Sequence, residues 1–158
     1  MEIRFAQPED VGGILSLLRQ VGGIHHQGRP DIFRSNAQKY GASQVLSMVD
    51  STSNPIFVAV EDGQVLGYGF CQLKEFSNDP VMQDYTSLYI DDLCVDEAHR
   101  GRKIGTQIYS AICRYAKQRH CYSITLNVWS CNASAQRFYE SLGLKPQKVC
   151  LESILEDA

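Results

Sequence analysis

A basic, glycine-containing turn is the stretch of this sequence in which residue types and spacing most clearly suggest chemistry. It reads His-Arg-Gly-Arg-Lys-Ile-Gly over residues 99–105, between an apolar run at 88–95 and a helical pattern that begins at Ile104. The first amides of a helix have no partner within the helix, and they attract anions together with the positive end of the helix dipole. Cationic side chains add bonds to phosphate oxygens. The turn therefore predicts a phosphate site, although a solvated basic helix start has the same composition.

The charge balance makes this turn a local feature of a mildly acidic chain. The 158 residues include 15 Lys and Arg and 18 Asp and Glu, for a formal net charge of −3. Neither a Gly-Lys-Ser/Thr sequence nor a Gly-x-Gly-x-x-Gly sequence occurs, so the usual loops for nucleoside triphosphates and dinucleotides are absent. We therefore expect a small anionic ligand, and neither nucleic acid nor a membrane as partner.

A second motif covers residues 132–144 and reads Asn-Ala-Ser-Ala-Gln-Arg-Phe-Tyr-Glu-Ser-Leu-Gly-Leu. Taken with the turn at 100–105, it resembles the GNAT superfamily of acetyl-CoA-dependent N-acetyltransferases. That family has Gln/Arg-x-x-Gly-x-Gly/Ala followed by Asn-x-x-Ala-x-x-Phe-Tyr-x-x-x-Gly-Phe, in this order. The resemblance covers nearly the whole chain and is strongest over residues 91–144.

Two positions depart from the family pattern. Leu144 replaces the final Phe, and Lys103 stands where the first glycine of the turn is usual. Because a right-handed helix start does not require glycine, we expect Lys103 to fit with its side chain pointing outward, where it adds a cation near the phosphates.

The resemblance implies one N-acetyltransferase domain over residues 1–158. The domain would use acetyl-CoA to acetylate the primary amine of a small cationic acceptor by direct attack, with no metal. It assigns cofactor binding to Leu93, Cys94, Val95, Arg100, Gly101, Arg102, Lys103, Ile104, Gly105, Thr106, Asn127, Asn132, Ala135 and Tyr139. It also implies that the region after the first helix lines the acceptor site, where the candidates are His25, His26 and Arg29, together with Asp91.

Three residues are candidates for proton transfer. Asp91 and Asp92 lie on the strand before the basic turn, where one could hold or deprotonate the amine. Neighbouring strand residues point to opposite faces, so only one should face the acceptor unless a bulge turns both. An alkylamine has a pKa near ~10.4 and a carboxyl group near ~4, so the base must have a raised pKa or act through water. Tyr139, seven residues after Asn132, is the candidate acid for the departing thiolate.

The pattern of elements predicts an α/β (α+β) fold. A strand at 2–6 precedes a helix that begins at Pro8 and ends at Gly22-Gly23, and a loop or broken helix follows at 24–36. The further elements that we expect are a helix at 43–49, strands at 56–60, 65–70, 86–95, 124–128 and 145–151, and helices at 104–119 and from 132 to a cap at Gly143. The family implies a mixed, mostly antiparallel sheet of six to seven strands, with helices on both faces and a splayed central strand pair.

Three points remain expectations. The six cysteines show no Cys-x-x-Cys pair, which favours free thiols in a cytoplasmic protein. Many family members dimerise, so a homodimer is predicted. The alternatives to a small-amine enzyme are acetylation of a protein or peptide at its N-terminus or a lysine, and a CoA-binding sensor module without turnover.

Overall fold

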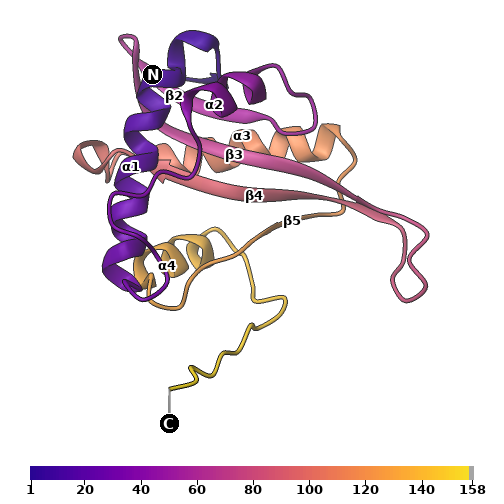
Figure 1. Cartoon of the computed structure of the whole chain (residues 1–158). Coiled ribbons are helices and arrows are strands. Elements are labelled where there is room, and N and C mark those ends of the chain that lie inside the picture. The colour runs from indigo at the N-terminus through magenta and orange to yellow at the C-terminus, as the bar shows by residue number, and fades with distance from the viewer. Residues whose placement is uncertain (157–158) are drawn as a thin grey trace.

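A five-stranded mixed sheet forms the centre of the computed structural model, which describes residues 1–156 (Figure 1). Its strands, in spatial as well as chain order, are β1 (Glu2–Phe5), β2 (Ile56–Glu61), β3 (Gln64–Phe76), β4 (Tyr85–Val95) and β5 (Ser123–Leu126). The first four pair antiparallel, and β4 and β5 pair parallel. The expected mixed, mostly antiparallel sheet is confirmed, but it has five strands in the described residues and not six or seven.

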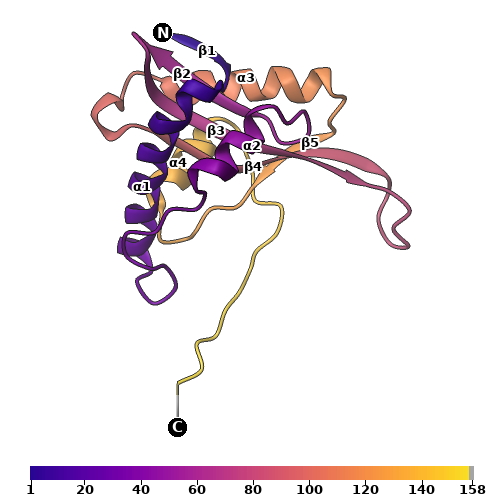
Figure 2. The same ribbon diagram turned by 45° about the horizontal axis from the view of Figure 1, so that its top comes forward.

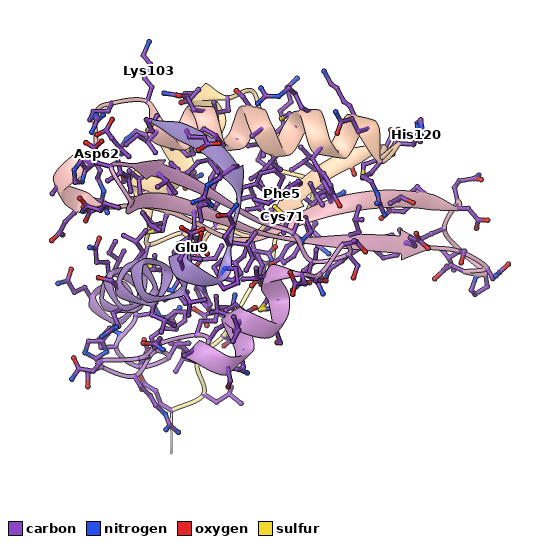
Figure 3. All side chains as sticks on the ribbon, turned by 90° about the horizontal axis from the view of Figure 1, so that it is seen from above. Phe5, Glu9, Asp62, Cys71, Lys103 and His120 are labelled. Carbon is purple, nitrogen blue, oxygen red and sulfur yellow. The ribbon has the colours of Figure 1, made fainter. Side chains whose placement is uncertain are left out.

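Helices cover both faces of this sheet, as the sequence predicted (Figure 3). The helical elements are η1 (Pro8–Asp10), α1 (Val11–Gly28), α2 (Ala42–Val49), η2 (Glu97–His99), α3 (Ile104–Gln118) and α4 (Ala133–Ser141). Buried side chains of α1 and α2 pack with Tyr68 and Phe70 in one apolar cluster. Buried side chains of α3 pack on the opposite face with Leu88 and Ile90. No described helix is long and apolar enough to cross a membrane.

The two parallel strands separate where the sequence analysis expected a splayed pair. β4 pairs with β5 only from Ser87–Ser123 to Ile90–Leu126. β4 continues to Val95, and from Asp92 onward it pairs with β3 alone. Residues 91–95 therefore have an open edge that faces away from β3, and backbone groups on such an edge need another partner.

One predicted boundary and one predicted strand were wrong. The first helix does not end at Gly22-Gly23 but continues to Gly28, so His25 and His26 lie on α1 and not in a loop. A Cβ on Gly22 would lie 2.1 Å from the carbonyl oxygen of Ala37, so this glycine permits close backbone approach within a continuous helix. The predicted strand at 145–151 does not form, because this segment leaves the sheet and every residue of it is exposed.

Candidate functional site

Free backbone amides line the basic turn between β4 and α3. Among the residues that the structure describes, none accepts a hydrogen bond from the amides of residues 101–106, and Gln107 is the first to donate, to the Lys103 carbonyl oxygen. Gly101 and Lys103 both have positive φ, at 83° and 59°. Alternating left-handed residues direct successive amides toward one point, which is a concave anion site. The turn therefore has the backbone geometry of an anion site, at the place where the sequence predicts a phosphate.

Lys103 occupies this turn in a way that the sequence analysis did not anticipate. Its φ of 59° lies in the left-handed region, so the expectation of a right-handed helix start at this position was wrong. A side chain there costs about 1–2 kcal/mol relative to glycine. The other half of the expectation is met, because the side chain of Lys103 projects away from the protein at the start of α3 (Figure 3).

The two arginines of the turn differ in their surroundings. Arg102 donates two hydrogen bonds to the carboxylate of Glu61 at the end of β2, at 2.9 and 3.1 Å. Its charge is therefore already paired. Arg100 is exposed, and its charge lowers the pKa of the nearby Cys94 thiol, which burial raises to about 12. Of the two, Arg100 has the guanidinium that is free for a phosphate.

The start of α3 makes its own contacts with α4. Ile104 and Gly105 are buried, and Thr106 is half-buried. A Cβ on Gly105 would lie 3.0 Å from the Phe138 ring, so this glycine makes room for α4 to pack against α3. Gly105 thus positions the second motif beside the first.

Three residues that the resemblance assigned to the cofactor lie on the open part of β4. Leu93 and Val95 pack toward the α3 face. Cys94 is buried toward α1, with its Sγ 3.9 Å from the Leu17 carbonyl oxygen. The side chains therefore belong to the apolar clusters on the two faces of the sheet. The backbone of this segment is what remains available to a ligand.

A β-bulge places both acidic residues on one face of the sheet. Phe70 pairs with Asp92 and Cys71 pairs with Ile90, so Asp91 is the extra residue of β4. Ile90 packs toward α3. Asp92 lies opposite Phe70 on the α1 face, and Asp91 reaches the same face, where it contacts Tyr40. The bulge that the sequence analysis allowed for is present.

The two carboxylates have different partners. Asp91 accepts a hydrogen bond from Lys39 Nζ at 2.9 Å and one from Tyr40 Oη at 2.5 Å, on its two separate oxygens. Asp92 accepts one, from Tyr68 Oη at 2.7 Å. Burial raises the pKa of Asp92, and the hydrogen bond from Tyr68 partly opposes this shift. Asp92 therefore has a free oxygen and a raised pKa, which are the properties that suit a general base.

Tyr139 lies near this acid on α4. Burial raises its pKa, and the negative charge of Asp92 raises it further. Its hydroxyl therefore stays protonated over the physiological pH range. Asn132 caps α4, with its Oδ1 accepting from the Ala135 amide at 3.1 Å, while its amide nitrogen keeps further donors. Asn127, just after β5, donates to Tyr89 Oη at 3.1 Å.

The end of α1 forms one wall of a pocket beside α4. The pocket has a volume of about 290 Å³, and its lining residues are Ile24, His25, Gln27, Gly28, Cys131 and Asn132. Burial raises the pKa of Asp92, and the charges of Lys39 and His25 lower it. Of the predicted acceptor residues, His25 lies in the wall of this pocket.

The other two predicted acceptor residues make structural contacts. His26 Nδ1 donates to the Phe33 carbonyl oxygen at 2.7 Å. Arg29 pairs with Asp31 and Glu152, and its guanidinium lies 5.9 Å from the centre of the Trp129 ring. The charge of Arg29 is therefore balanced within the chain.

Several residues of this site carried no signal in the sequence. Tyr68 and Tyr40 bind the two acids from other elements, and Lys39 pairs with Asp91. Phe33 contacts both the His25 ring and the Trp129 ring. Only the pairing of β3 with β4 could have indicated Tyr68, which lies opposite Cys94.

A larger hollow of about 450 Å³ lies between α1 and the β2–β3 turn. Its lining includes Glu9, Asp62 and Asp96. These acids would repel phosphate groups, so this hollow does not compete with the basic turn as the site of an anionic ligand.

Comparison with known proteins agrees with this geometry. The chain is 24% identical over 146 residues to the thialysine N-epsilon-acetyltransferase of Mus musculus, with 89% of this chain and 82% of that protein aligned. The structure of a tetramutant of the BH1408 protein from Bacillus halodurans superposes with a TM-score of 0.93 at 36% identity, covering 98% of this chain and 100% of that one. The aminoglycoside N-acetyltransferase AAC(6')-Iy in complex with CoA shares the fold alone, at 14% identity and a TM-score of 0.71, over 99% of this chain and 100% of that one. The model of the acetyltransferase (GNAT) family matches residues 26–144, and the chain therefore belongs to this family.

Proposed function

We propose that this protein is an acetyl-CoA-dependent N-acetyltransferase, that its acceptor is a small cationic amine, and that residues 1–158 form one catalytic domain. The observation that carries the proposal is the position of Asp92. This carboxylate lies on the open segment of β4 that leads directly into the amide-lined turn. A base and a phosphate site on one short segment suit a reaction between an amine and a CoA thioester.

The cofactor site is supported by groups that lack partners within the described residues. The amides of residues 101–106 and the guanidinium of Arg100 would hold the diphosphate. The open edge of β4 would pair with the amides of the pantetheine arm, as an added strand would. Asn132 would donate to the same arm. Bound acetyl-CoA supplies a thioester whose carbonyl carbon an amine can attack.

The acceptor class follows from the pocket and the charges around it. A pocket of about 290 Å³ suits a small molecule. Asp91 has Lys39 as a counter-ion, whereas no Lys or Arg side chain bonds to Asp92 among the described residues, so the negative charge of Asp92 is the one that would bind the acceptor. This charge favours an ammonium group over a neutral or acidic acceptor.

Two proton transfers are assigned to named residues. Asp92 Oδ1 would accept a proton from the bound ammonium group, and its raised pKa makes this transfer less uphill than for an ordinary carboxylate. Tyr139 would donate its hydroxyl proton to the departing sulfur, and the proton that the attacking nitrogen loses as the tetrahedral intermediate collapses would restore the hydroxyl. Because its pKa is raised, donation must accompany cleavage of the carbon–sulfur bond. Asp91 would hold the side chains of Lys39 and Tyr40 in place through its hydrogen bonds to them.

We also propose that the protein is cytoplasmic. All six cysteines are free thiols, which suits the reducing conditions of the cytoplasm.

The test is a screen of acceptors with acetyl-CoA. Polyamines, lysine analogues, aminoglycosides and short peptides are incubated with the enzyme, and both the released thiol and the mass of the acetylated product are measured. We expect acetylation of small cationic amines at rates well above those for their neutral or acidic analogues. Acetylation of peptides alone would overturn the acceptor class. Binding of acetyl-CoA without turnover of any amine would instead indicate a CoA-binding sensor module.

A further inference from the structure

One lysine of the chain lies against the acidic segment of β4. Lys39 belongs to residues 29–41, which lead from the end of α1 back to α2 over the same face of the sheet (Figure 2). Its Nζ donates to Asp91 Oδ1 at 2.9 Å and lies 3.4 Å from the Asp91 carbonyl oxygen. Asp91 begins the open part of β4, where the pantetheine arm of acetyl-CoA would bind. A primary amine of the protein itself therefore lies where the acceptor amine is expected.

The ammonium group of Lys39 differs from those of the other five lysines. Within residues 1–156, which include all six, Lys39 is the one lysine that pairs with a carboxylate. Its side chain is 47% exposed, whereas that of Asp91 is 11% exposed. Ion pairs with an exposed partner are weak, so the amine can leave Asp91 at little cost. Lys39 is thus both held at the site and free to react there.

We propose that Lys39 is an internal acceptor, so that the protein acetylates the Nζ of its own Lys39 when no small amine is bound. The inference rests on the proposed function, because it uses the same acetyl-CoA site. The same base is also within the site, since the bulge in β4 brings Asp92 to the face on which Lys39 contacts Asp91.

The chemistry needs no group beyond those already assigned. Lys39 would give one proton of its ammonium group to Asp92, and its nitrogen would then form a bond to the carbonyl carbon of the thioester. The carbon–sulfur bond breaks with its electron pair on sulfur. The sulfur takes the hydroxyl proton of Tyr139, and the nitrogen returns a second proton to that hydroxyl. The products are a neutral acetamide on Lys39 and CoA as a free thiol.

Acetylation of Lys39 would change the charge of the acceptor site. An acetamide carries no charge, so Asp91 would lose its counter-ion and keep the hydrogen bond from Tyr40. Two carboxylates without a counter-ion among the described residues would then lie on one face of β4. The acetylated protein should therefore bind an amine with two ammonium groups more tightly than the protein with a free Lys39.

Peptide masses test the modification directly. The protein is incubated with acetyl-CoA that carries ¹³C in its acetyl group, without an amine, and the label on each lysine is followed over time. We expect Lys39 to be labelled at least about tenfold faster than Lys117 and Lys148, which are exposed and report uncatalysed acetylation. The rate constant should not depend on protein concentration, because the acceptor belongs to the same chain. Labelling of Lys39 no faster than of Lys117, or a rate constant proportional to protein concentration, would overturn the proposal.

Two parallel reactions separate this inference from the proposed function. In the first, a small cationic amine is added and its acetylated product is measured. Acetylation of the amine without any label on Lys39 would overturn the inference alone, and the absence of both products would overturn the proposed function as well. In the second, Asp92→Asn replaces the wild type, and the label on Lys39 should appear about 10²–10⁴ more slowly while that on Lys117 is unchanged. An unchanged rate at Lys39 would show uncatalysed acetylation and contradict the proposal.

Binding of amines without acetyl-CoA tests the change of charge. Lys39→Gln has a neutral amide in place of the ammonium group, as the acetylated side chain does, and Lys39→Arg is the matched control that keeps the charge. Calorimetry with 1,4-diaminobutane should give a Kd about threefold lower for Lys39→Gln than for Lys39→Arg. The difference should be smaller with 4-amino-1-butanol, which has one ammonium group. Equal Kd values of the diamine for the two variants would overturn the proposed effect of acetylation on acceptor binding.

Discussion

Asp91 and Asp92 are adjacent in β4, yet their carboxyl groups lie on the same face of the sheet. The bulge at Asp91 removes the alternation that a regular strand imposes. Each acid then accepts a hydrogen bond from a tyrosine hydroxyl. Tyr40 donates to Asp91 at 2.5 Å, and Tyr68 donates to Asp92 at 2.7 Å. The site therefore contains two similar carboxylates in different surroundings, and within residues 1–156 only Asp92 keeps an oxygen without a hydrogen-bond partner.

Removing each carboxylate singly should separate their roles. Asp92→Asn removes the proposed base, and kcat should fall by about 10²–10⁴. Asp91→Asn weakens the bonds to Lys39 and Tyr40 without touching the base, and kcat should fall by less than about tenfold. Steady-state kinetics with a good amine acceptor compares the two. Equal losses would show that the two acids act as a unit.

The raised pKa of Asp92 also predicts a pH-dependent cost in stability. Burial disfavours its ionised form in the folded state, so the folded pKa lies above the unfolded one. Its contribution to stability is then fully present below the unfolded pKa and is lost as pH rises through the folded pKa. Asp92→Asn should therefore have a higher Tm than the wild type near pH 7, and the difference should shrink toward pH ~3. A lower Tm of the variant at neutral pH would contradict the assignment.

The hydroxyl of Tyr68 should set the pH at which Asp92, the proposed base, loses its proton. Its hydrogen bond lowers the pKa of Asp92, so Tyr68→Phe should move the acidic limb of the kcat/KM profile to higher pH. Tyr40→Phe is the matched control, because it removes the corresponding bond from Asp91. The limb should stay in place in this control. An equal displacement in both variants would point to a general loosening of the strand.

Substitution of Lys103 should separate backbone strain from charge. Lys103→Gly removes the left-handed strain and adds backbone entropy to the unfolded state, for a net gain on the order of 0.5–1 kcal/mol. A gain of this size raises Tm by roughly 1–4 °C. Lys103→Ala keeps a Cβ and should not be stabilised. If the ammonium group contacts phosphate, both variants should bind CoA several-fold more weakly, as measured by calorimetry. Unchanged affinity in both would remove Lys103 from the cofactor site.

Local signals in the sequence predicted much of the fold. Asp62-Gly63 forms the β2–β3 turn with φ values of 49° and 77°, and Gly143 ends α4 with φ of 90°. Both depend on residues that are neighbours in the chain, which is why a sequence pattern can show them.

The remaining features depend on contacts between distant segments. The bulge at Asp91 depends on the register with β3, and Tyr40 lies 51 residues from its partner in the sequence. The continuation of α1 past Gly22 depends on the close approach of the Ala37 backbone to this glycine. The sequence analysis assigned Asp91 and Asp92 to the site as neighbours, but only the structure distinguishes their partners.

The most direct test of the central claim, that this protein is an acetyltransferase with Tyr139 as its acid, is the kcat of Tyr139→Phe measured beside its affinity for CoA. The variant keeps the ring, so CoA affinity and Tm should match the wild type. We predict a fall in kcat of about 10²–10⁴. Because burial raises the pKa of Tyr139, the hydroxyl stays protonated over the physiological pH range, and the rate there should be lowered without a change in the shape of the profile. A loss in kcat of less than about threefold would contradict the claim, because the hydroxyl would then take no part in thiolate departure.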